Sequence, residues 1–410
     1  MSGYKKFAIQ KGKASVCLEF DADSGSVSKF IEVTKGGKSS GLKGTPSVSS
    51  DVIGISKKVK VYSAWKSGKG NPYSSLRLGL TNDYTTDEKV DSLHGIIRDE
   101  ILNDKIANAF LKEEIISLLD DAERLLPVAH GSEYLPLLQG KLLANMFFEP
   151  STRTRMSFET AMKRLGGDVV NLGDVNSSSA VKGETLYDTM RMVDGYCDIA
   201  ALRHPRQGAA QYAADACGIP IMNGGDGAGH HPTQTLLDLF TIRQAHGRLD
   251  GLTVALVGDL RYGRTVHSLS HALARFDCNL VFISPAQLAM PAEIVSDLTT
   301  DGASITETED LYGAIPDADV IYMTRIQKER FPDEDEYAKV AGIYKLTAAD
   351  LAGAKGEMIV MHPLPRVNEI SSDVDSTRHA RYFEQAFNGV VARMALMCRL
   401  LNVEIPGGDS

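Results

Sequence analysis

The sequence predicts an α/β protein in which two doubly wound parallel-sheet domains enclose a cleft, preceded by a small N-terminal β-rich module. Strands and helices alternate along two successive stretches of the chain, as they do where helices connect parallel strands. Clusters of polar residues directly follow several strands, at the ends where open α/β sheets bind ligands. The first 92 residues differ from the remainder in charge and in pattern.

Composition and charge limit the classes of protein to consider. The 410 residues suit two or three domains of about 150 residues each. The net charge of −9 argues against a general nucleic-acid partner. No apolar run approaches the ~20 residues of a membrane helix. The five cysteines are scattered, with neither metal nor disulfide spacing, which favours a reducing, cytoplasmic location.

A shift in charge marks a candidate domain boundary. Residues 1–92 carry a net charge of +6, whereas the rest of the chain carries −15. We predict a basic β-rich module of unknown function over residues 1–92. Residues 93–247 are predicted to form the first α/β domain, closed by a C-terminal helix over residues 381–403, and residues 248–380 the second. The helical pattern that opens the first domain is predicted to end at Pro127.

Hydrophobic periodicity places the elements of both domains. In the first, the predicted strands are Leu142–Phe148, Asp168–Leu172, Ile199–Leu202 and Ile219–Met222, and the predicted helices are Ser151–Leu165, Thr185–Tyr196, Gly208–Ala216 and Thr233–Ala245. In the second, the predicted strands are Leu252–Val257, Leu280–Ser284, Val320–Met323 and Met358–Met361, with a helix over Val266–Phe276.

The segment Ser151-Thr152-Arg153-Thr154-Arg155 lies where a strand turns into a helix. Ser151 or Thr152 can cap that helix, and the unpaired N–H groups at its start attract anions. Arg153 and Arg155 add full charges whose geometry matches phosphate oxygens. We interpret the segment as a phosphate pocket; the alternative is a well-capped helix with two solvated arginines.

Other polar residues follow further strands. Arg203 comes directly after one strand, and His231 begins a helix after a Gly-rich turn. Arg264, Arg325 and the segment His362-Pro363-Leu364-Pro365 follow strands of the second domain. Several arginines at strand ends of an acidic chain indicate a substrate with several negative groups. Beside them, His231 is a candidate for binding a reacting carbonyl.

One polar loop, Ser177 to Glu184, precedes a predicted helix. We interpret it as a lid that brings Lys182 to an anion, with an ordinary surface loop as the alternative. The chain has neither a G-x-G-x-x-G nor a G-x-x-x-x-G-K-[ST] motif, and no convincing cluster of metal ligands. The sequence therefore predicts no nucleotide cofactor and no metal.

These motifs together resemble the aspartate/ornithine carbamoyltransferase family. The resemblance rests on Ser151 to Arg155, His231-Pro232-Thr233-Gln234 and His362-Pro363-Leu364-Pro365. The loop ending Lys182-Gly183-Glu184, the stretch from Gly258 to His267, and Thr324-Arg325-Ile326-Gln327 are similar to the aspartate-specific members. The resemblance runs from about residue 110 to residue 403 and leaves residues 1–92 outside.

The resemblance implies transfer of the carbamoyl group of carbamoyl phosphate to L-aspartate, a step of pyrimidine biosynthesis, in a homotrimer with shared active sites. It implies that Ser151, Thr152, Arg153 and Thr154 hold the phosphate, that Arg203 bridges phosphate and carbonyl, and that His231 and Gln234 hold the carbamoyl group. It further implies that Arg264, Arg325 and Gln327 bind the aspartate carboxylates. The backbone of Pro363, Leu364 and Pro365 would receive the amine and carbamoyl groups, and Ser178 and Lys182 would enter from the neighbouring subunit.

Two other classes compete with this interpretation. Ornithine carbamoyltransferases share the phosphate motif but carry a Cys where this chain has Pro363, and Arg325 with Gln327 favours a dicarboxylate. A non-catalytic carbamoyltransferase-like assembly subunit is the second, although Arg153, Lys182 and His231 are all present. Higher assembly through residues 1–92, or with regulatory or dihydroorotase-like chains, stays open.

Overall fold

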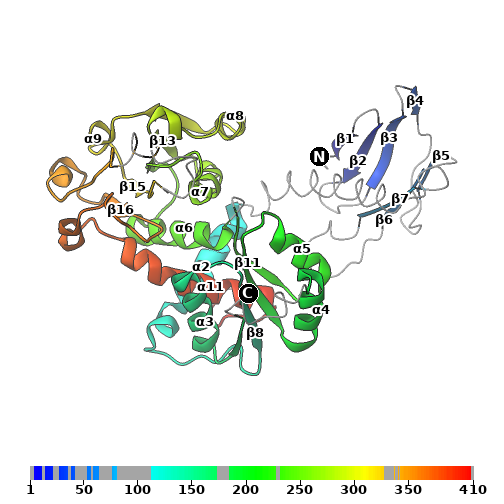
Figure 1. Ribbon diagram of the computed structural model, residues 1–410, viewed down its shortest axis with the longest axis horizontal. Coiled ribbons are helices and arrows are strands. Elements are labelled where there is room, and N and C mark those ends of the chain that lie inside the picture. Colours follow the sequence, from blue (N-terminus) through cyan, green and yellow to red (C-terminus); the bar gives the residue numbers. More distant parts are fainter. Residues whose placement is uncertain are drawn as a thin grey trace. The chain divides into compact units, whose positions relative to one another are not determined.

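The computed structural model describes residues 112–172, 184–227, 231–326, 337, 340 and 342–407, together with seven strands within the first 80 residues (Figure 1). The chain divides into two compact units, Met1–Leu111 and Lys112–Ser410. The strands of the first unit are β1 Tyr4–Lys11, β2 Ala14–Asp21, β3 Val27–Lys35, β4 Lys38–Gly41, β5 Ile53–Ser56, β6 Val59–Ser63 and β7 Leu76–Leu80. They form two antiparallel sheets, β1-β2-β3-β4 and β5-β6-β7.

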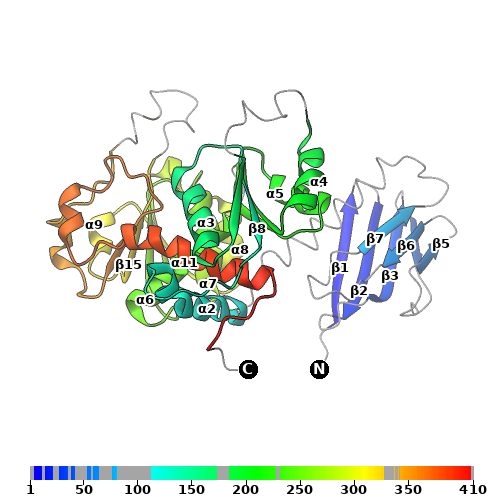
Figure 2. The same ribbon diagram turned by 90° about the horizontal axis from the view of Figure 1, so that it is seen from below.

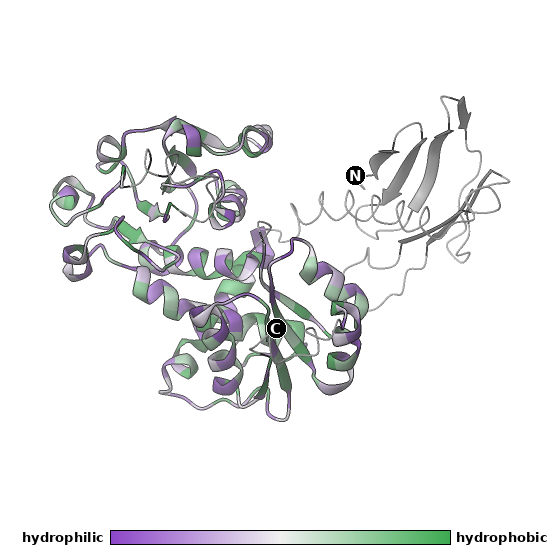
Figure 3. Ribbon diagram, in the orientation of Figure 1, coloured by the Kyte–Doolittle hydropathy of each residue, from purple (hydrophilic) through white to green (hydrophobic). Residues whose placement is uncertain are grey.

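The second unit begins with a four-stranded parallel sheet in the order β11-β10-β8-β9. Its strands are β8 Leu142–Phe147, β9 Asp168–Leu172, β10 Ile199–His204 and β11 Ile221–Asp226. The helices that follow these strands are α3 Thr152–Arg164, α4 Leu186–Tyr196, α5 Ala209–Ala216 and α6 Pro232–His246. Hydrophobic residues run along the strands (Figure 3), as expected for a parallel sheet buried on both faces.

A five-stranded parallel sheet follows in the order β14-β13-β12-β15-β16. Its strands are β12 Thr253–Val257, β13 Asn279–Ile283, β14 Ser304–Thr308, β15 Val320–Met323 and β16 Ile359–Met361. The helices are α7 Arg264–Ala274, α8 Ala292–Thr300 and α9 Leu311–Ala314, with short 3-10 turns at Ala286–Leu288, Asp350–Gly353 and Ser372–Ser376. The predicted fold class of two parallel-sheet α/β domains is therefore confirmed.

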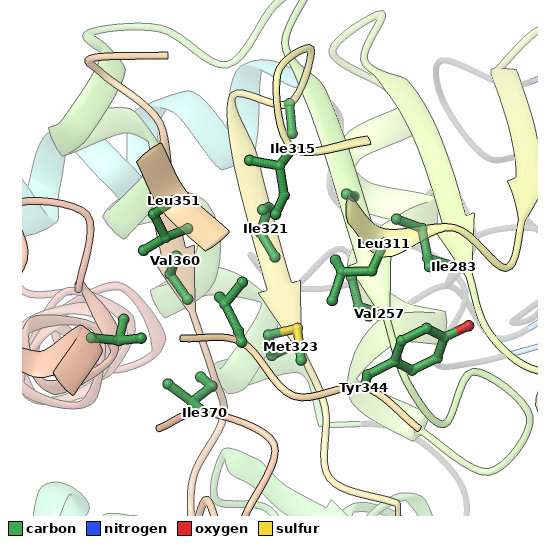
Figure 4. Packing of buried hydrophobic residues seen from close by; sticks show 14 of the residues in the cluster. Val257, Ile283, Leu311, Ile315, Ile321, Met323, Tyr344, Leu351, Val360 and Ile370 are labelled. Carbon is green, nitrogen blue, oxygen red and sulfur yellow. The ribbon is translucent and has the colours of Figure 1, made fainter. Parts of the chain in front are cut away.

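One face of the second sheet carries a large hydrophobic core (Figure 4). Val257, Ile321 and Val360 come from neighbouring strands, and Leu311 and Tyr344 pack against them from outside the sheet. All five side chains are buried. This core holds the central strands rigidly, so that the loops at their carboxyl ends have a fixed base.

The C-terminal helix α11, Tyr382–Leu400, contacts α2, α3 and α6 and also reaches β16 of the second sheet (Figure 2). Helix α2 spans Lys112–His130 and contains Pro127. The prediction that Pro127 ends this helix is wrong, since the helix continues for three more residues. Pro127 lies in the last turn and its own carbonyl accepts the N–H groups of Ser132 and Glu133, so the helix terminates around it.

All strands within each sheet run parallel, but the order in which successive strands are added to the sheet reverses at one pair of strands. In the first sheet this pair is β8 and β10, and in the second it is β12 and β15. Ligands of open α/β sheets bind outside the carboxyl ends of the strands at such reversals. The Ser151–Arg155 segment, Arg203, Arg264 and Arg325 lie at or after the carboxyl ends of these four strands. His231 and His362 follow the neighbouring strands β11 and β16.

In the second sheet and its helices, the sequence did not predict the strand β14 or the helices α8 and α9. Strand β14 is an edge strand that pairs only with β13, and most of its residues are exposed. Its sequence therefore lacks the continuous apolar run of the central strands. Helix α8 has nine residues and buries only Leu298, which is too weak a pattern for periodicity to detect.

Candidate functional site

A pocket with a volume of about 950 Å³ lies at the carboxyl ends of the strands. Its walls come from both sheets: the segments after β8 and β10 and the start of α6 on one side, and the segments after β12, β15 and β16 on the other. Helix α11 supplies part of the floor. The lining includes Glu149, Ser151, Thr152, Arg153, Thr154, Arg203, His231, Gln234, Asp259, Tyr262, Arg264, Thr324, Arg325, His362, Pro363, Leu364, Pro365, Gln385 and Arg393.

Twelve of the predicted site residues thus line one pocket. The other three, Ser178, Lys182 and Gln327, lie outside the described residues. Their assignments stay predictions.

The segment Ser151–Thr154 forms the start of α3 and faces the pocket. Ser151 stands at the N-cap position with extended backbone, but its side chain makes no capping hydrogen bond. The expected capping bond is thus absent. The start of α3 and Arg153 both line the pocket, and the free N–H groups of a helix N-terminus favour a bound anion. Burial, and then the charge of Arg203, lower the pKa of Arg153.

Arg155 does not join this cluster. Its Nε lies 3.4 Å from Asn171 Oδ1 on β9, and Arg155 does not line the pocket. The expectation that both Arg153 and Arg155 serve the anion is therefore wrong for Arg155. Residues two apart on a helix point in different directions, so only one of the two reaches the pocket.

Glu149 lies between two arginines. The Arg203 Nε donates to Glu149 Oε2 at 3.1 Å, and Arg264 Nη2 is 4.0 Å from the same oxygen. Arg203 also donates to the carbonyl of Gly224, and Arg264 to that of Gly227. A carboxylate held by guanidinium groups from both sheets shows that this position binds negative charge.

His231 is buried, with 4 % of its surface exposed. Its Nδ1 lies 3.5 Å from Thr233 Oγ1. Burial, and then the charges of Arg393, Arg203 and Arg264, hold the pKa of His231 well below its ordinary value. The imidazole is therefore neutral near pH 7 and can donate one hydrogen bond to a substrate oxygen.

A buried carboxylate, Asp238, lies behind the pocket wall. It accepts hydrogen bonds from Gln234 Nε2 at 2.9 Å, Gln385 Nε2 at 2.6 Å and Tyr322 OH at 2.9 Å. Burial raises the pKa of Asp238 to about 7, although these three bonds act to lower it. Because the amide nitrogen of Gln234 points to Asp238, its amide oxygen is left for a ligand N–H.

The loop after β16 is held by His362. Its Nδ1 accepts the N–H of Leu364 at 2.7 Å, so Nε2 carries the proton and donates to Glu369 Oε1 at 2.7 Å. Burial acts to raise the pKa of Glu369, but hydrogen bonds from His362 and backbone N–H groups lower it to about 2. The carbonyl groups around Pro363 and Leu364 are thereby fixed at the pocket rim.

Close backbone packing shapes the loop after β12. Gly258 has a φ of +113°, and a Cβ there would lie 2.6 Å from the carbonyl oxygen of Thr324. The Thr324 hydroxyl donates to the carbonyl of Val257 and accepts the N–H of Asp259. Only glycine allows the two loops to approach this closely, and their approach carries Arg264 and Arg325 to the same pocket.

Sequence reasoning missed several pocket residues. Glu149 lies two residues before the Ser151–Arg155 segment, but the sequence pattern indicated no partner for it. Gln385 and Arg393 lie on α11, far along the chain from the other motifs, and only the fold brings them to the pocket. No group of three His, Cys, Asp or Glu side chains arranged for a metal occurs within the described residues.

Both halves of the second unit match one family. Residues 106–244 match the carbamoyl-P binding domain of aspartate/ornithine carbamoyltransferase, and residues 250–400 match its Asp/Orn binding domain. The chain belongs to the aspartate/ornithine carbamoyltransferase family, as the sequence motifs predicted. Residues 1–105 lie outside both matches.

Two similar curated proteins are aspartate carbamoyltransferase catalytic subunits. The aspartate carbamoyltransferase catalytic subunit of Archaeoglobus fulgidus is 57 % identical over 290 residues, which are 71 % of this chain and 96 % of that protein. The corresponding subunit of Thermococcus kodakarensis is 54 % identical over 294 residues, or 72 % of this chain and 95 % of its own length.

Two similar solved structures are also aspartate transcarbamoylases. The catalytic subunit of M. jannaschii aspartate transcarbamoylase matches with a TM-score of 0.67 and 51 % identity, covering 71 % of this chain and 94 % of that one. Aspartate transcarbamoylase from Trypanosoma cruzi in complex with N-(phosphonacetyl)-L-aspartic acid matches with a TM-score of 0.67 and 43 % identity, covering 71 % and 93 %. The chain contains almost the full length of both.

Among the described residues, no helix is long and apolar enough to cross a membrane.

Proposed function

We propose that this protein transfers the carbamoyl group of carbamoyl phosphate to the amine of L-aspartate, giving N-carbamoyl-L-aspartate and phosphate. The observation that carries the proposal is the single pocket in which Ser151–Thr154 and Arg203 from one sheet face Arg264 and Arg325 from the other. Such a pocket offers cationic groups at two separated places, as a phosphate and a dicarboxylate require. The relatives named above support the same assignment.

The carbamoyl phosphate half of the site is assigned to the first sheet. Ser151, Thr152, Arg153 and Thr154 bind the phosphate through hydroxyls, backbone N–H groups and the Arg153 guanidinium. Arg203 bridges phosphate and carbonyl. In this assignment His231 donates to the carbonyl oxygen and the Gln234 oxygen accepts from the carbamoyl nitrogen. Lys182 and Ser178 are assigned to the same half from a neighbouring subunit.

The aspartate half is assigned to the second sheet. Arg264 and Arg325 bind the two carboxylates, together with Gln327. The backbone carbonyls around Pro363, Leu364 and Pro365 receive the amine and the carbamoyl nitrogen. This places the nucleophilic amine beside the carbonyl carbon.

The reaction proposed for this pocket is direct attack of the amine on the carbonyl, without a covalent enzyme intermediate. Arg153, Thr154, Arg203 and His231 stabilise the oxyanion and the departing phosphate, and loss of one such donor costs about 3 kcal/mol. Holding both reactants in contact supplies roughly 7–11 kcal/mol of the barrier. The departing phosphate accepts the proton of the amine.

The proposal also covers the domain bounds and the assembly of the protein. The first substrate domain spans residues 93–247 with the helix at 381–403, and the second spans residues 248–380. The active protein is a cytoplasmic homotrimer in which each pocket receives Ser178 and Lys182 of a neighbouring chain. Residues 1–92 act in assembly or regulation rather than in the reaction. The position of the family matches, which begin at residue 106, supports this division.

The test is turnover with carbamoyl phosphate and either aspartate or ornithine, using the wild type and Arg153→Ala. We expect product with aspartate only, and its loss in the variant. Turnover with ornithine would overturn the choice of acceptor. Absence of turnover with both amines, in a folded protein, would favour a non-catalytic assembly subunit.

A further inference from the structure

A buried arginine of the C-terminal helix lies behind His231. Arg393 has 3 % of its surface exposed. Its guanidinium carbon lies 4.6 Å from the centre of the Phe158 ring, its Nη1 donates to the carbonyl of Gly389 at 2.9 Å, and its Nη2 donates to Thr233 Oγ1 at 3.1 Å. The position of the guanidinium is therefore fixed on three sides.

The contact with Thr233 determines the direction of a chain of hydrogen bonds. A guanidinium can only donate, so Thr233 Oγ1 must accept from Arg393. The hydroxyl proton of Thr233 is then available to a second partner, and His231 Nδ1 lies 3.5 Å away. A hydroxyl that donates to Nδ1 requires that nitrogen to be unprotonated.

We propose that Arg393 and Thr233 are positioning residues that hold the neutral imidazole of His231 with its proton on Nε2, so that this N–H donates to the carbonyl oxygen of carbamoyl phosphate. The proposal deepens the function proposed above and rests on it for the identity of the acceptor. Neither Arg393 nor Thr233 needs to touch the substrate.

The charge of Arg393 contributes in a second way. After burial, this charge is the largest cause of the lowered pKa of His231. A second proton on the imidazole is thereby disfavoured. The neutral ring therefore carries one proton, on either Nδ1 or Nε2. The Thr233 hydroxyl, oriented by Arg393 so that it donates to Nδ1, favours the tautomer with the proton on Nε2.

The opposite tautomer of His231, with the proton on Nδ1, would interact differently with the substrate. An oxygen has two lone pairs, so Thr233 Oγ1 could accept from both Arg393 and a protonated His231 Nδ1. His231 Nε2 would then be an acceptor and could not stabilise negative charge on the carbonyl oxygen. The two arrangements predict opposite protonation of the two ring nitrogens.

The first test is the nitrogen-15 NMR spectrum of histidine-labelled protein without substrates, with His231→Gln used to assign the His231 signals. The proposal predicts a protonated-type signal for Nε2 and an unprotonated-type signal for Nδ1. The reverse pattern, or an even mixture in the wild type, would overturn it. The spectrum is recorded without turnover, so its outcome is independent of whether the protein uses aspartate.

The second test compares two variants of Thr233. Thr233→Val removes the hydroxyl while keeping the shape, and we expect a mixed His231 tautomer and a kcat lowered about tenfold, the effect of losing one hydrogen bond, with an unchanged KM for aspartate. Thr233→Ser restores the hydroxyl and should recover both the tautomer and most of kcat. A Thr233→Val protein with wild-type spectrum and kcat would contradict the proposal.

The matched control is Thr235→Val, two residues along the same helix. Thr235 Oγ1 is buried and makes no hydrogen bond to any described residue, so this variant should keep the wild-type spectrum and turnover. Should Thr233→Val fail to fold, Arg393→Lys supplies the same comparison. The lysine keeps the positive charge but is too short to hold the guanidinium's two contacts at once, and we expect it to weaken the tautomer preference.

Discussion

Glu149 and Arg203 form an ion pair inside the pocket, with Arg203 Nε 3.1 Å from Glu149 Oε2. Both side chains are largely shielded from water, Arg203 with 14 % and Glu149 with 33 % of the side chain exposed. Arg264, the first residue of α7 in the other half of the unit, approaches the same carboxylate at 4.0 Å. Glu149 therefore links the groups assigned to the two substrates.

Replacing Glu149 tests that link. In Glu149→Ala the two guanidinium groups lose their shared partner and repel each other, so their orientation is no longer fixed. We expect kcat/KM for aspartate to fall by about ten- to a hundredfold, with less effect on the melting temperature. Steady-state kinetics measure this, with Glu133→Ala in an exposed loop as the control. Unchanged kcat/KM would mean that the ion pair has no role in the reaction.

Two arginines on α3 provide a matched pair. Arg153 lines the pocket, whereas Arg155 contacts Asn171 on β9. We expect Arg153→Ala to lower kcat by about a hundredfold or more, since a charged donor at the transition state is lost. Arg155→Ala should keep kcat within a few-fold of the wild type. Equal losses in both variants would show that the helix as a whole, not the Arg153 guanidinium, was disturbed.

Asp238 fixes two amides that face the site. In Asp238→Asn one of the three donors from Gln234, Gln385 and Tyr322 must lose its acceptor, because the new amide nitrogen cannot accept. We expect about a tenfold loss of kcat/KM for carbamoyl phosphate, measured at saturating aspartate. Asp120→Asn, at a half-exposed ion pair with Arg243, serves as the control and should have little effect. The idea fails if both variants behave alike.

The His362–Glu369 pair makes stability depend on pH. The pKa of Glu369 is lowered in the folded protein from 4.5 to about 2. Its contribution to stability is therefore complete above pH 4.5 and is lost as the pH falls toward 2, amounting to about 3 kcal/mol. Because pH 3 still lies above the folded pKa, we expect the difference in unfolding free energy between the wild type and Glu369→Gln to shrink by about 2 kcal/mol between pH 7 and pH 3.

Urea denaturation at both pH values measures this difference. The control is Glu384→Gln at an exposed ion pair with Arg381, which should give a nearly constant difference. A constant difference for Glu369→Gln would contradict a lowered pKa.

The proposed independence of residues 1–92 can be tested by deletion. The remaining chain, residues 93–410, keeps the full length of both family matches and the whole second unit, Lys112–Ser410. We expect it to fold and to turn over carbamoyl phosphate and aspartate at a rate within a few-fold of the wild type, with an altered assembly state. Light scattering and kinetics measure both. Loss of the folded core would refute the division.

Much of the site could be predicted because its residues follow strands. Arg203 is the last residue but one of β10, Arg325 stands two residues after β15, and Arg264 begins the helix that follows β12. Parallel strands bring such positions to one edge of a sheet. Most element bounds were close for the same reason, since the central strands are continuous apolar runs bounded by turns. The exception is β11, predicted at Ile219–Met222 and found at Ile221–Asp226, because its second half contains Asn223, Gly224 and Gly225 rather than apolar residues.

The remaining features depend on tertiary packing. Arg393 lies on a helix that is apolar on nearly all sides, so the pattern does not tell which face meets α6 and His231. Arg153 lines the pocket and Arg155 does not because residues two apart on a helix point in different directions. The charges in the sequence do not distinguish the two positions. The interest of Glu149 lies in its contacts with Arg203 and Arg264, and only the fold brings these three residues together.

The central claim is that one pocket holds both substrates at once, and calorimetric titration with N-(phosphonacetyl)-L-aspartic acid, which joins a phosphonate to an aspartate, tests it most directly. We expect one ligand to bind per chain, with binding strongly weakened by either Arg153→Ala or Arg325→Ala. Binding that tolerates both substitutions, or that requires only one of the two arginines, would contradict the account.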